Sequence, residues 1–145
     1  MKIQQILATK GSHVVTIHPW QLIRDAVAIL YRHRIGALVV IDEAAQPVGL
    51  LSERDILWAA AGNESLFDLR VRELMTREII CGDPESDIEA VAHTMTERRI
   101  RHIPVMEEGA LVGIISIGDV VKAQRDAYQG ALYTLETMMI EVPLA

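Results

Sequence analysis

The chain contains nearly the same ten-residue segment twice. "VGLLSERDIL" begins at Val48 and "VGIISIGDVV" begins at Val112, 64 positions later, with Gly, Ser and Asp at the same places. The similarity extends outward, because residues 14–43 align with 79–108 at an offset of 65 and residues 45–58 with 109–122 at an offset of 64. The offset changes between "DEAAQP" and "EEGA", where a turn can absorb one residue. Self-similarity of this kind predicts two copies of one structural unit.

The first part of each copy predicts a strand followed by a helix. The β-branched runs "HVVTI" and "EIIC" predict short strands, and Pro19 or Pro84 then gives a helix-start signal. Apolar residues next recur at a spacing near 3.6, which predicts a helix with one buried stripe. These residues are Leu22, Ile23, Ala26, Val27 and Leu30 in the first copy, and Ile88, Val91, Ala92 and Met95 in the second.

The second part of each copy predicts a hairpin and a further helix. "ALVVI" precedes "PVGLLS", and "HIPVM" precedes "LVGIIS", each pair close enough to form a hairpin before a helix that begins at Ser52 or Ser116. A unit of strand, helix, strand, strand and helix is too small to be comfortably stable alone. We therefore expect an α/β fold in which two such repeats, residues 1–65 and 66–127, pack about a pseudo-two-fold axis and residues 128–145 form a C-terminal helical tail.

Composition limits the classes of partner. Half of the 145 residues are apolar, so a core can form, and the net charge of −6 argues against a nucleic-acid binder. The apolar stretches, such as "IGALVVI" from Ile35, are much shorter than the roughly 20 residues that span a bilayer. The single cysteine, Cys81, fits a reducing compartment. We expect a cytoplasmic protein that binds neither nucleic acid nor membrane.

The repeated Ser and Asp allow two interpretations. Ser52 with Asp55, and Ser116 with Asp119, have the spacing of a helix cap in which the Ser hydroxyl and the acidic side chain bond to backbone N–H groups. Asp is shorter than the Glu or Gln usual in such a cap, and it can instead accept two adjacent ribose hydroxyls while the Ser and the helix N-terminus face a phosphate. The preceding glycines, Gly49 and Gly113, indicate close packing or close approach of a ligand.

Other candidate sites are weaker. Two cationic clusters, Arg32-His33-Arg34 and Arg98 to His102, could face a small anion or complement the negative ends of helices. The five histidines lack the spacing of metal ligands, and Cys81, with no partner motif, is expected to be a small core residue. We find no catalytic constellation, so we expect neither a metal centre nor an enzyme.

The repeated segments occur in a fixed order with two other matched pairs. "ILATKGSHVVTIHP" and "ELMTREIICGDP" open the copies, and "RIGALVVID" and "RIRHIPVME" lie in their middles. Each half resembles a CBS domain, the cystathionine-β-synthase type of regulatory repeat, and residues 1–126 resemble the tandem called a Bateman module. The resemblance implies a stand-alone, non-enzymatic regulatory protein. It would bind an adenine nucleotide such as AMP, ADP or ATP, or a related adenosyl ligand, in the cleft between repeats and signal to an unknown partner in trans.

The resemblance also implies site residues. In the family the Asp grips the ribose hydroxyls and the Ser lies near phosphate, which implies Asp55, Asp119, Ser52 and Ser116. The adenine slot would come from the first strand and the start of the second, here Val15, Thr16, Ile35 and Ala37 in repeat one and Ile80, Cys81, His102 and Pro104 in repeat two. The Arg54 guanidinium can make a bidentate bond to phosphate. Repeat two has Gly118 at the equivalent position, and there Arg101 and His102 are the cationic candidates for binding phosphate. The two sites should therefore differ.

The tail carries one apolar stripe. Tyr128, Ala131, Leu132, Leu135, Met138 and Met139 keep a helical spacing, and residues 128–145 contain no Lys or Arg. This stripe either packs on its own module or docks on a second subunit or another protein, and we favour a homodimer contact. Two other functions stay open: a dimeric interaction module with vestigial pockets, and a metal-responsive or redox-responsive module that uses histidines and Cys81.

Overall fold

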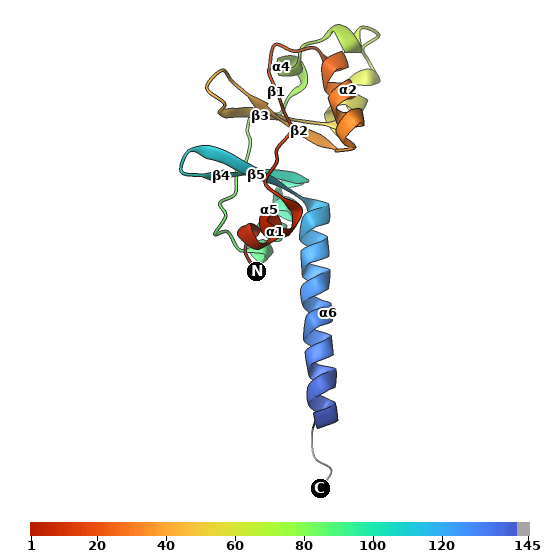
Figure 1. Cartoon of the computed structure of the whole chain (residues 1–145). Coiled ribbons are helices and arrows are strands. Elements are labelled where there is room, and N and C mark those ends of the chain that lie inside the picture. The colour runs from red at the N-terminus through yellow and green to blue at the C-terminus, as the bar shows by residue number, and fades with distance from the viewer. Residues whose placement is uncertain (142–145) are drawn as a thin grey trace.

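The computed structural model describes residues 1–141. These residues form two α/β halves that stack on each other, and one long helix projects from the lower half (Figure 1). Residues 142–145 of the predicted tail lie outside the described residues. The helices are α1 (Ile3–Lys10), α2 (Ile23–His33), α3 (Glu53–Ala60), α4 (Val71–Leu74), α5 (Ile88–Arg98) and α6 (Ile117–Glu141), with a 3-10 turn η1 (Leu66–Asp68). The strands are β1 (Thr16–Ile17), β2 (Ala37–Ile41), β3 (Pro47–Ser52), β4 (His102–Glu107) and β5 (Ala110–Ser116).

The predicted hairpins are confirmed, and the predicted first strands are only partly so. β2 pairs antiparallel with β3, and β4 pairs antiparallel with β5. β1 is two residues long and runs parallel to β2. The strand predicted for "EIIC" is wrong, because residues 78–81 form none; the chain reaches β4 only at an isolated parallel bridge between Gly82 and Val105. Repeat two therefore keeps the path of the first strand without its regular hydrogen bonding.

The predicted helical stripes are confirmed. Ile23, Ala26 and Leu30 of α2 are buried, as are Ile88, Val91 and Met95 of α5; these sets belong to two separate hydrophobic clusters. The expected start at the prolines is wrong by four residues, since Pro19 and Pro84 lie in turns that precede the helices. Pro19 instead lies in the turn between β1 and α2, and Pro84 lies in the turn between the bridge at Gly82 and α5.

The core of each half includes a segment from the other half of the chain. Ile3, Ile6 and Leu7 of α1 are buried with the side chains of repeat two, whereas Leu66 and Val71 are buried with those of repeat one. Leu7 of α1 lies against Gly113 of β5, and Figure 1 shows α1 in the half of the molecule that holds β4, β5 and α5. The opening segment of each repeat thus packs on the opposite repeat, which links the two halves.

The tail continues the last helix of repeat two. α6 runs for 25 residues without a break from the repeated Ser-Asp segment into the tail. Its first turns pack on β5 and α5, with Val120 and Ala123 buried. From Tyr128 onward its large apolar side chains are exposed, so the alternative that the stripe packs on its own module is wrong. In the part of the chain that the structure describes, no helix has the length and apolar character needed to cross a membrane.

Candidate functional site

Both repeated Ser-Asp pairs form the reciprocal cap. Ser52 N–H donates to Asp55 Oδ2 at 2.9 Å, and Asp55 N–H donates to Ser52 Oγ at 3.2 Å. The bonds between Ser116 and Asp119 have the same pattern, at 2.8 and 3.1 Å. Asp is therefore long enough for this cap. In the capped geometry each carboxylate is held at a helix N-terminus, where the backbone N–H groups also favour an anion.

In repeat one, backbone pairing brings several predicted residues together. Ala37 pairs with Ser52 across the hairpin, and Thr16 pairs with Val39 on the neighbouring strand. The carbonyl of Val15 accepts from Val39 N–H at 3.4 Å. Val15, Thr16 and Ile35 are half-buried, whereas Ala37 is buried. The end of the sheet thus places the apolar candidates beside the cap that holds Asp55.

Repeat two makes the matching arrangement. His102 pairs with Ser116, and the carbonyl of Arg101 accepts from Ile117 N–H at 2.8 Å. Gly82 N–H donates to the carbonyl of Pro104 at 2.7 Å, which brings Cys81 and its neighbour Ile80 close to β4. Pro104 is buried, Ile80 is half-buried and Arg101 is exposed. Cys81 is also exposed, so the expectation of a small core residue is wrong; partial burial still raises the pKa of its thiol.

A lysine outside the predicted site residues distinguishes the two caps. Lys10, the last residue of α1, places its Nζ 2.5 Å from Asp119 Oδ2 and 2.8 Å from the carbonyl oxygen of Ile114. Burial raises the pKa of Asp119, but the hydrogen bonds from Lys10 and Ser116 and the lysine charge outweigh it and hold the pKa below its ordinary value. Among residues 1–141, Asp55 has no such cation partner.

The two repeats meet near His102. A side chain at Gly36 would lie 3.7 Å from His102 Cε1 and 3.3 Å from Glu53 Oε1, so glycine leaves room for both groups. Burial lowers the pKa of His102, and the nearby charge of Lys10 lowers it further, while Glu53 and Asp119 oppose the shift. His102 is therefore a half-buried imidazole at the junction, surrounded by charges of both signs.

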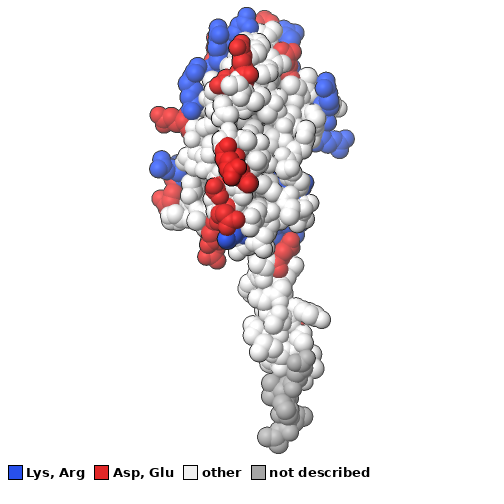
Figure 2. Space-filling view, turned by 60° about the vertical axis from the view of Figure 1, so that its left-hand side comes forward, with Lys and Arg blue, Asp and Glu red and all other residues white. Residues whose placement is uncertain are grey.

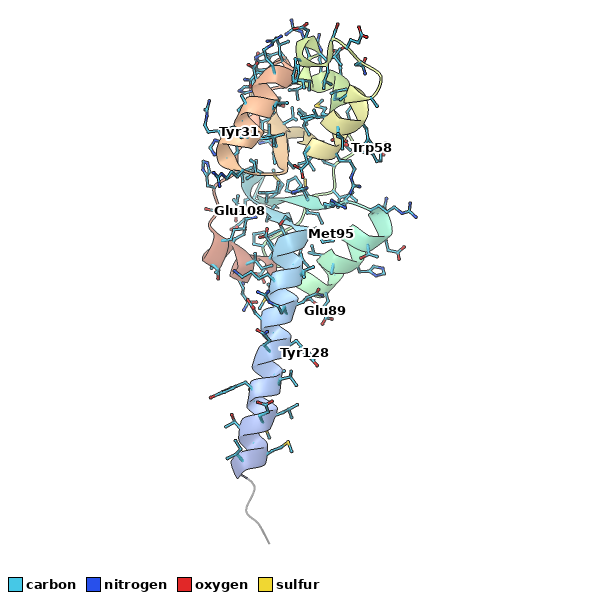
Figure 3. All side chains as sticks on the ribbon, turned by 90° about the vertical axis from the view of Figure 1, so that its right-hand side faces the viewer. Tyr31, Trp58, Glu89, Met95, Glu108 and Tyr128 are labelled. Carbon is cyan, nitrogen blue, oxygen red and sulfur yellow. The ribbon has the colours of Figure 1, made fainter. Side chains whose placement is uncertain are left out.

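The cationic candidates, Arg54 and the two clusters, lie at separate places in the fold. Arg54 lies on α3 with its guanidinium carbon 5.9 Å from the ring centre of Trp58, a cation–π contact within its own helix. In the two cationic clusters, Arg32 and His33 lie in the last turn of α2 and Arg98 lies in the last turn of α5, which fits the interpretation that these clusters complement helix ends. Figure 3 shows Trp58 and Tyr31 on opposite sides of repeat one.

Two cavities include one predicted residue each. A cavity of about 210 Å³ between α1 and α6 is lined by Asp119 together with Thr9, Lys10 and Lys122. A second, of about 470 Å³, is lined by Thr16 and by residues of the two hairpin turns. In the described part of the chain, no three His, Cys, Asp or Glu residues gather in a way that could hold a metal ion.

The geometry agrees with one known family. The family model of the CBS domain matches residues 5–62 and 71–126. The solved CBS-domain containing protein from Agrobacterium tumefaciens is 39% identical and superimposes with a TM-score of 0.83, over 86% of this chain and 99% of that one. The CBS domain pair of protein MJ0100, solved with 5′-methylthioadenosine and S-adenosyl-L-methionine, is 27% identical with a TM-score of 0.79, over 88% and 98%.

An oligomeric relative is also similar. The hexameric CBS-CP12 protein from bloom-forming cyanobacteria is 31% identical with a TM-score of 0.74, over 83% of this chain and 69% of that one. The chain belongs to the CBS domain family. It is a tandem of two CBS repeats with a C-terminal helix, and CBS pairs are generally regulatory modules.

Proposed function

We propose that this protein senses an adenine nucleotide, or a related adenosyl compound, in the cleft between its two repeats. The observation that carries the proposal is the pair of matched caps, which hold Asp55 and Asp119 at helix N-termini beside the ends of β2 and β4. Binding of adenosyl ligands by the similar CBS pair of protein MJ0100 supports the ligand class.

The roles follow from the chemistry of each group. The Asp carboxylates accept hydrogen bonds from the ribose hydroxyls, and the helix N-termini with Ser52 and Ser116 face the phosphate. Half-buried Val15, Thr16 and Ile35 contact adenine in repeat one, together with the backbone at Ala37. In repeat two, Ile80, Cys81, His102 and the backbone at Pro104 do so, and exposed Arg101 stays close to the phosphate.

In this proposal Arg54 exchanges its contact with Trp58 for a bond to the phosphate. An exposed cation–π contact of this kind is worth about 0.5–1 kcal/mol, so a bidentate bond to phosphate would replace it at little loss. The ligand would bridge the two repeats, and different affinities for two inter-repeat angles would convert binding into a change of shape.

We also propose that two copies pair through the protruding part of α6. On the face shown in Figure 2, this part of the helix is uncharged, while the body carries charges of both signs. Figure 3 shows Tyr128 where α6 leaves the body. An isolated helix with exposed apolar side chains is marginal in water, so it needs a partner to bury them.

The spacing of that stripe suits a second copy of the same helix. Four residues of the predicted stripe, at positions 128, 131, 135 and 138, continue a series from positions 121 and 124 in steps of three and four, and Val121, Tyr128, Leu135 and Met138 are exposed there. This is the seam of a coiled coil, for which an identical helix supplies the matching surface. The stripe carries no Lys or Arg that would favour an acidic partner. The hexameric relative supports self-association in general.

In this proposal the paired modules act in the cytoplasm and pass the signal to a partner protein in trans. The direct test is calorimetric titration of AMP, ATP and adenosine into nucleotide-free protein, repeated with Asp55→Ala and Asp119→Ala. Saturable binding that each substitution reduces supports the function. Unchanged binding in both variants contradicts the role of the carboxylates, and absence of binding would leave an interaction module with vestigial pockets.

A further inference from the structure

The two repeats use different donors to bond one equivalent backbone carbonyl. "LATK", residues 7–10, corresponds to "LMTR", residues 74–77, so Lys10 and Arg77 are counterparts. In repeat one, the carbonyl of Leu50 accepts from Thr76 N–H at 2.9 Å, a backbone bond. In repeat two, the equivalent carbonyl of Ile114 accepts from the Lys10 ammonium at 2.8 Å. A side chain thus replaces a backbone donor in repeat two.

This replacement brings a positive charge onto one cap only. Lys10 Nζ, held by Ile114, also donates to Asp119 Oδ2, the same oxygen that accepts from Ser116 N–H. Arg77 instead donates to the carbonyl of Arg72 at 3.0 Å. The side chains of Lys10 and Asp119 are only 32% and 23% exposed, so solvent screens their ion pair less than it screens a pair at the surface.

We infer that Lys10 competes with an adenosyl ligand for the Asp119 carboxylate. The ligand therefore binds first at Asp55, and its ribose hydroxyls bond to both carboxylate oxygens of Asp119 only when Lys10 moves away. This inference rests on the proposed function, because it assigns an order to the two positions of that site. It follows from hydrogen-bond capacity: Oδ2 of Asp119 already accepts two bonds, whereas Oδ2 of Asp55 accepts only the bond from Ser52 N–H among the described residues.

The competition links the ligand to α1. Lys10 is the last residue of α1, whose Ile3, Ile6 and Leu7 lie in the core of repeat two. A ligand that displaces the ammonium from Asp119 therefore removes a contact between the end of α1 and the start of α6. The residue at position 10 consequently sets the affinity of the Asp119 position for the ligand. It also determines whether ligand binding there removes a contact of α1.

The test isolates each position with a matched pair of variants. Adenosine is titrated into Asp55→Ala, which leaves only the Asp119 position, and into the double variant Asp55→Ala with Lys10→Met, which keeps the apolar stem and removes the charge. The control compares Asp119→Ala with Asp119→Ala plus Arg77→Met. We expect Lys10→Met to tighten adenosine binding about two- to fivefold, the range for loss of a partly exposed ion pair, and Arg77→Met to leave it unchanged.

Parallel titrations with AMP separate competition from direct phosphate binding. If Lys10→Met weakens AMP binding and leaves adenosine binding unchanged, Lys10 is a phosphate ligand and the inference is overturned. If adenosine binds the single variants but Lys10→Met has no effect, the inference fails while the proposed function stands. If adenosine and AMP bind to none of the proteins, wild type included, both fail. Thermal melting of each variant confirms that it is folded.

Discussion

Leu7 occupies the space that a side chain at position 113 would need. A methyl group at Gly113 would lie 2.6 Å from Leu7 Cδ2, and one at Gly49 would lie 2.6 Å from Met75 Sδ and 3.0 Å from the carbonyl oxygen of Thr76. The two repeated glycines therefore serve packing: each lets the opening segment of one repeat lie against the hairpin of the other.

Gly113→Ala should destabilise the protein by about 1–3 kcal/mol, the range for overpacking a core, because buried Leu7 must shift. Gly49→Ala should do the same, since the Thr76 carbonyl cannot rotate away. Gly130→Ala is the control: it lies within α6 with open space around it, and alanine favours a helix. Urea denaturation measures all three. Equal stability of Gly113→Ala and wild type would show that Leu7 does not hold this position.

Removing the charge of Asp119 should lower the free energy of unfolding more at neutral pH than in acid. Its folded pKa lies below the ordinary 3.8, so its contribution is present above that value and is lost as the pH falls through the folded pKa. Asp119→Asn keeps an acceptor for Ser116 N–H but loses the ion pair with Lys10. We expect lower stability than wild type at pH 7 and a smaller gap at about pH 3. Asp126→Asn, an exposed change on α6, is the control; an equal gap at both pH values contradicts the ion pair.

His102 should make the protein less stable in mild acid. Its folded pKa lies below 6.5, so the unfolded chain takes up a proton first as the pH falls. The stability that neutral His102 contributes is complete above pH 6.5 and decreases as the pH drops towards the folded pKa. The wild-type Tm should therefore fall between pH 8 and about pH 5.5, and His102→Gln should reduce that fall. His93→Gln, on the exposed face of α5, should not; equal falls in both variants would rule out His102 as the source.

Glutamate in the α6 seam should separate paired copies. Leu135→Glu places a charge at a seam position, whereas Tyr133→Glu places one on the opposite side of the same helix turn, and both native side chains are exposed. We expect light scattering to give a dimer for wild type and Tyr133→Glu, and a monomer for Leu135→Glu. A monomeric wild type contradicts self-association, and a dimeric Leu135→Glu places the interface elsewhere.

Much of the fold could be predicted because it is set by local patterns. Apolar runs close enough to pair predicted the hairpins β2–β3 and β4–β5, and the helical apolar spacing predicted the buried faces of α2 and α5. The pairing of α1 with repeat two could not be predicted, since nothing local to Ile3, Ile6 or Leu7 says which half they pack on. The prediction of a strand at residues 78–81 was wrong because β-branched residues favour an extended backbone but do not guarantee a neighbouring strand to pair with.

The site was predictable only where the repeat itself marks it. Ser52, Asp55, Ser116 and Asp119 stand in matched positions, and both pairs cap a helix as the spacing indicates. Lys10 and Glu53 were missed, because a lysine at a helix end is usually read as complementing the dipole. The comparison of "LATK" with "LMTR" was the available signal: the two segments end in different cations, and the structure directs those cations to different partners.

Adenosyl binding is tested by calorimetric titration of AMP, ATP, adenosine, S-adenosylmethionine and NADH into nucleotide-free protein, with mass spectrometry of what co-purifies. Asp25→Ala serves as the control, since Asp25 accepts from the Leu22 N–H at the start of α2 in the same way that Asp55 caps α3, but lies outside the proposed site. We expect saturable binding of an adenosyl ligand that Asp55→Ala or Asp119→Ala reduces and Asp25→Ala preserves. Absence of binding by all five ligands, with nothing co-purifying, would contradict it and leave the repeated Ser and Asp as helix caps alone.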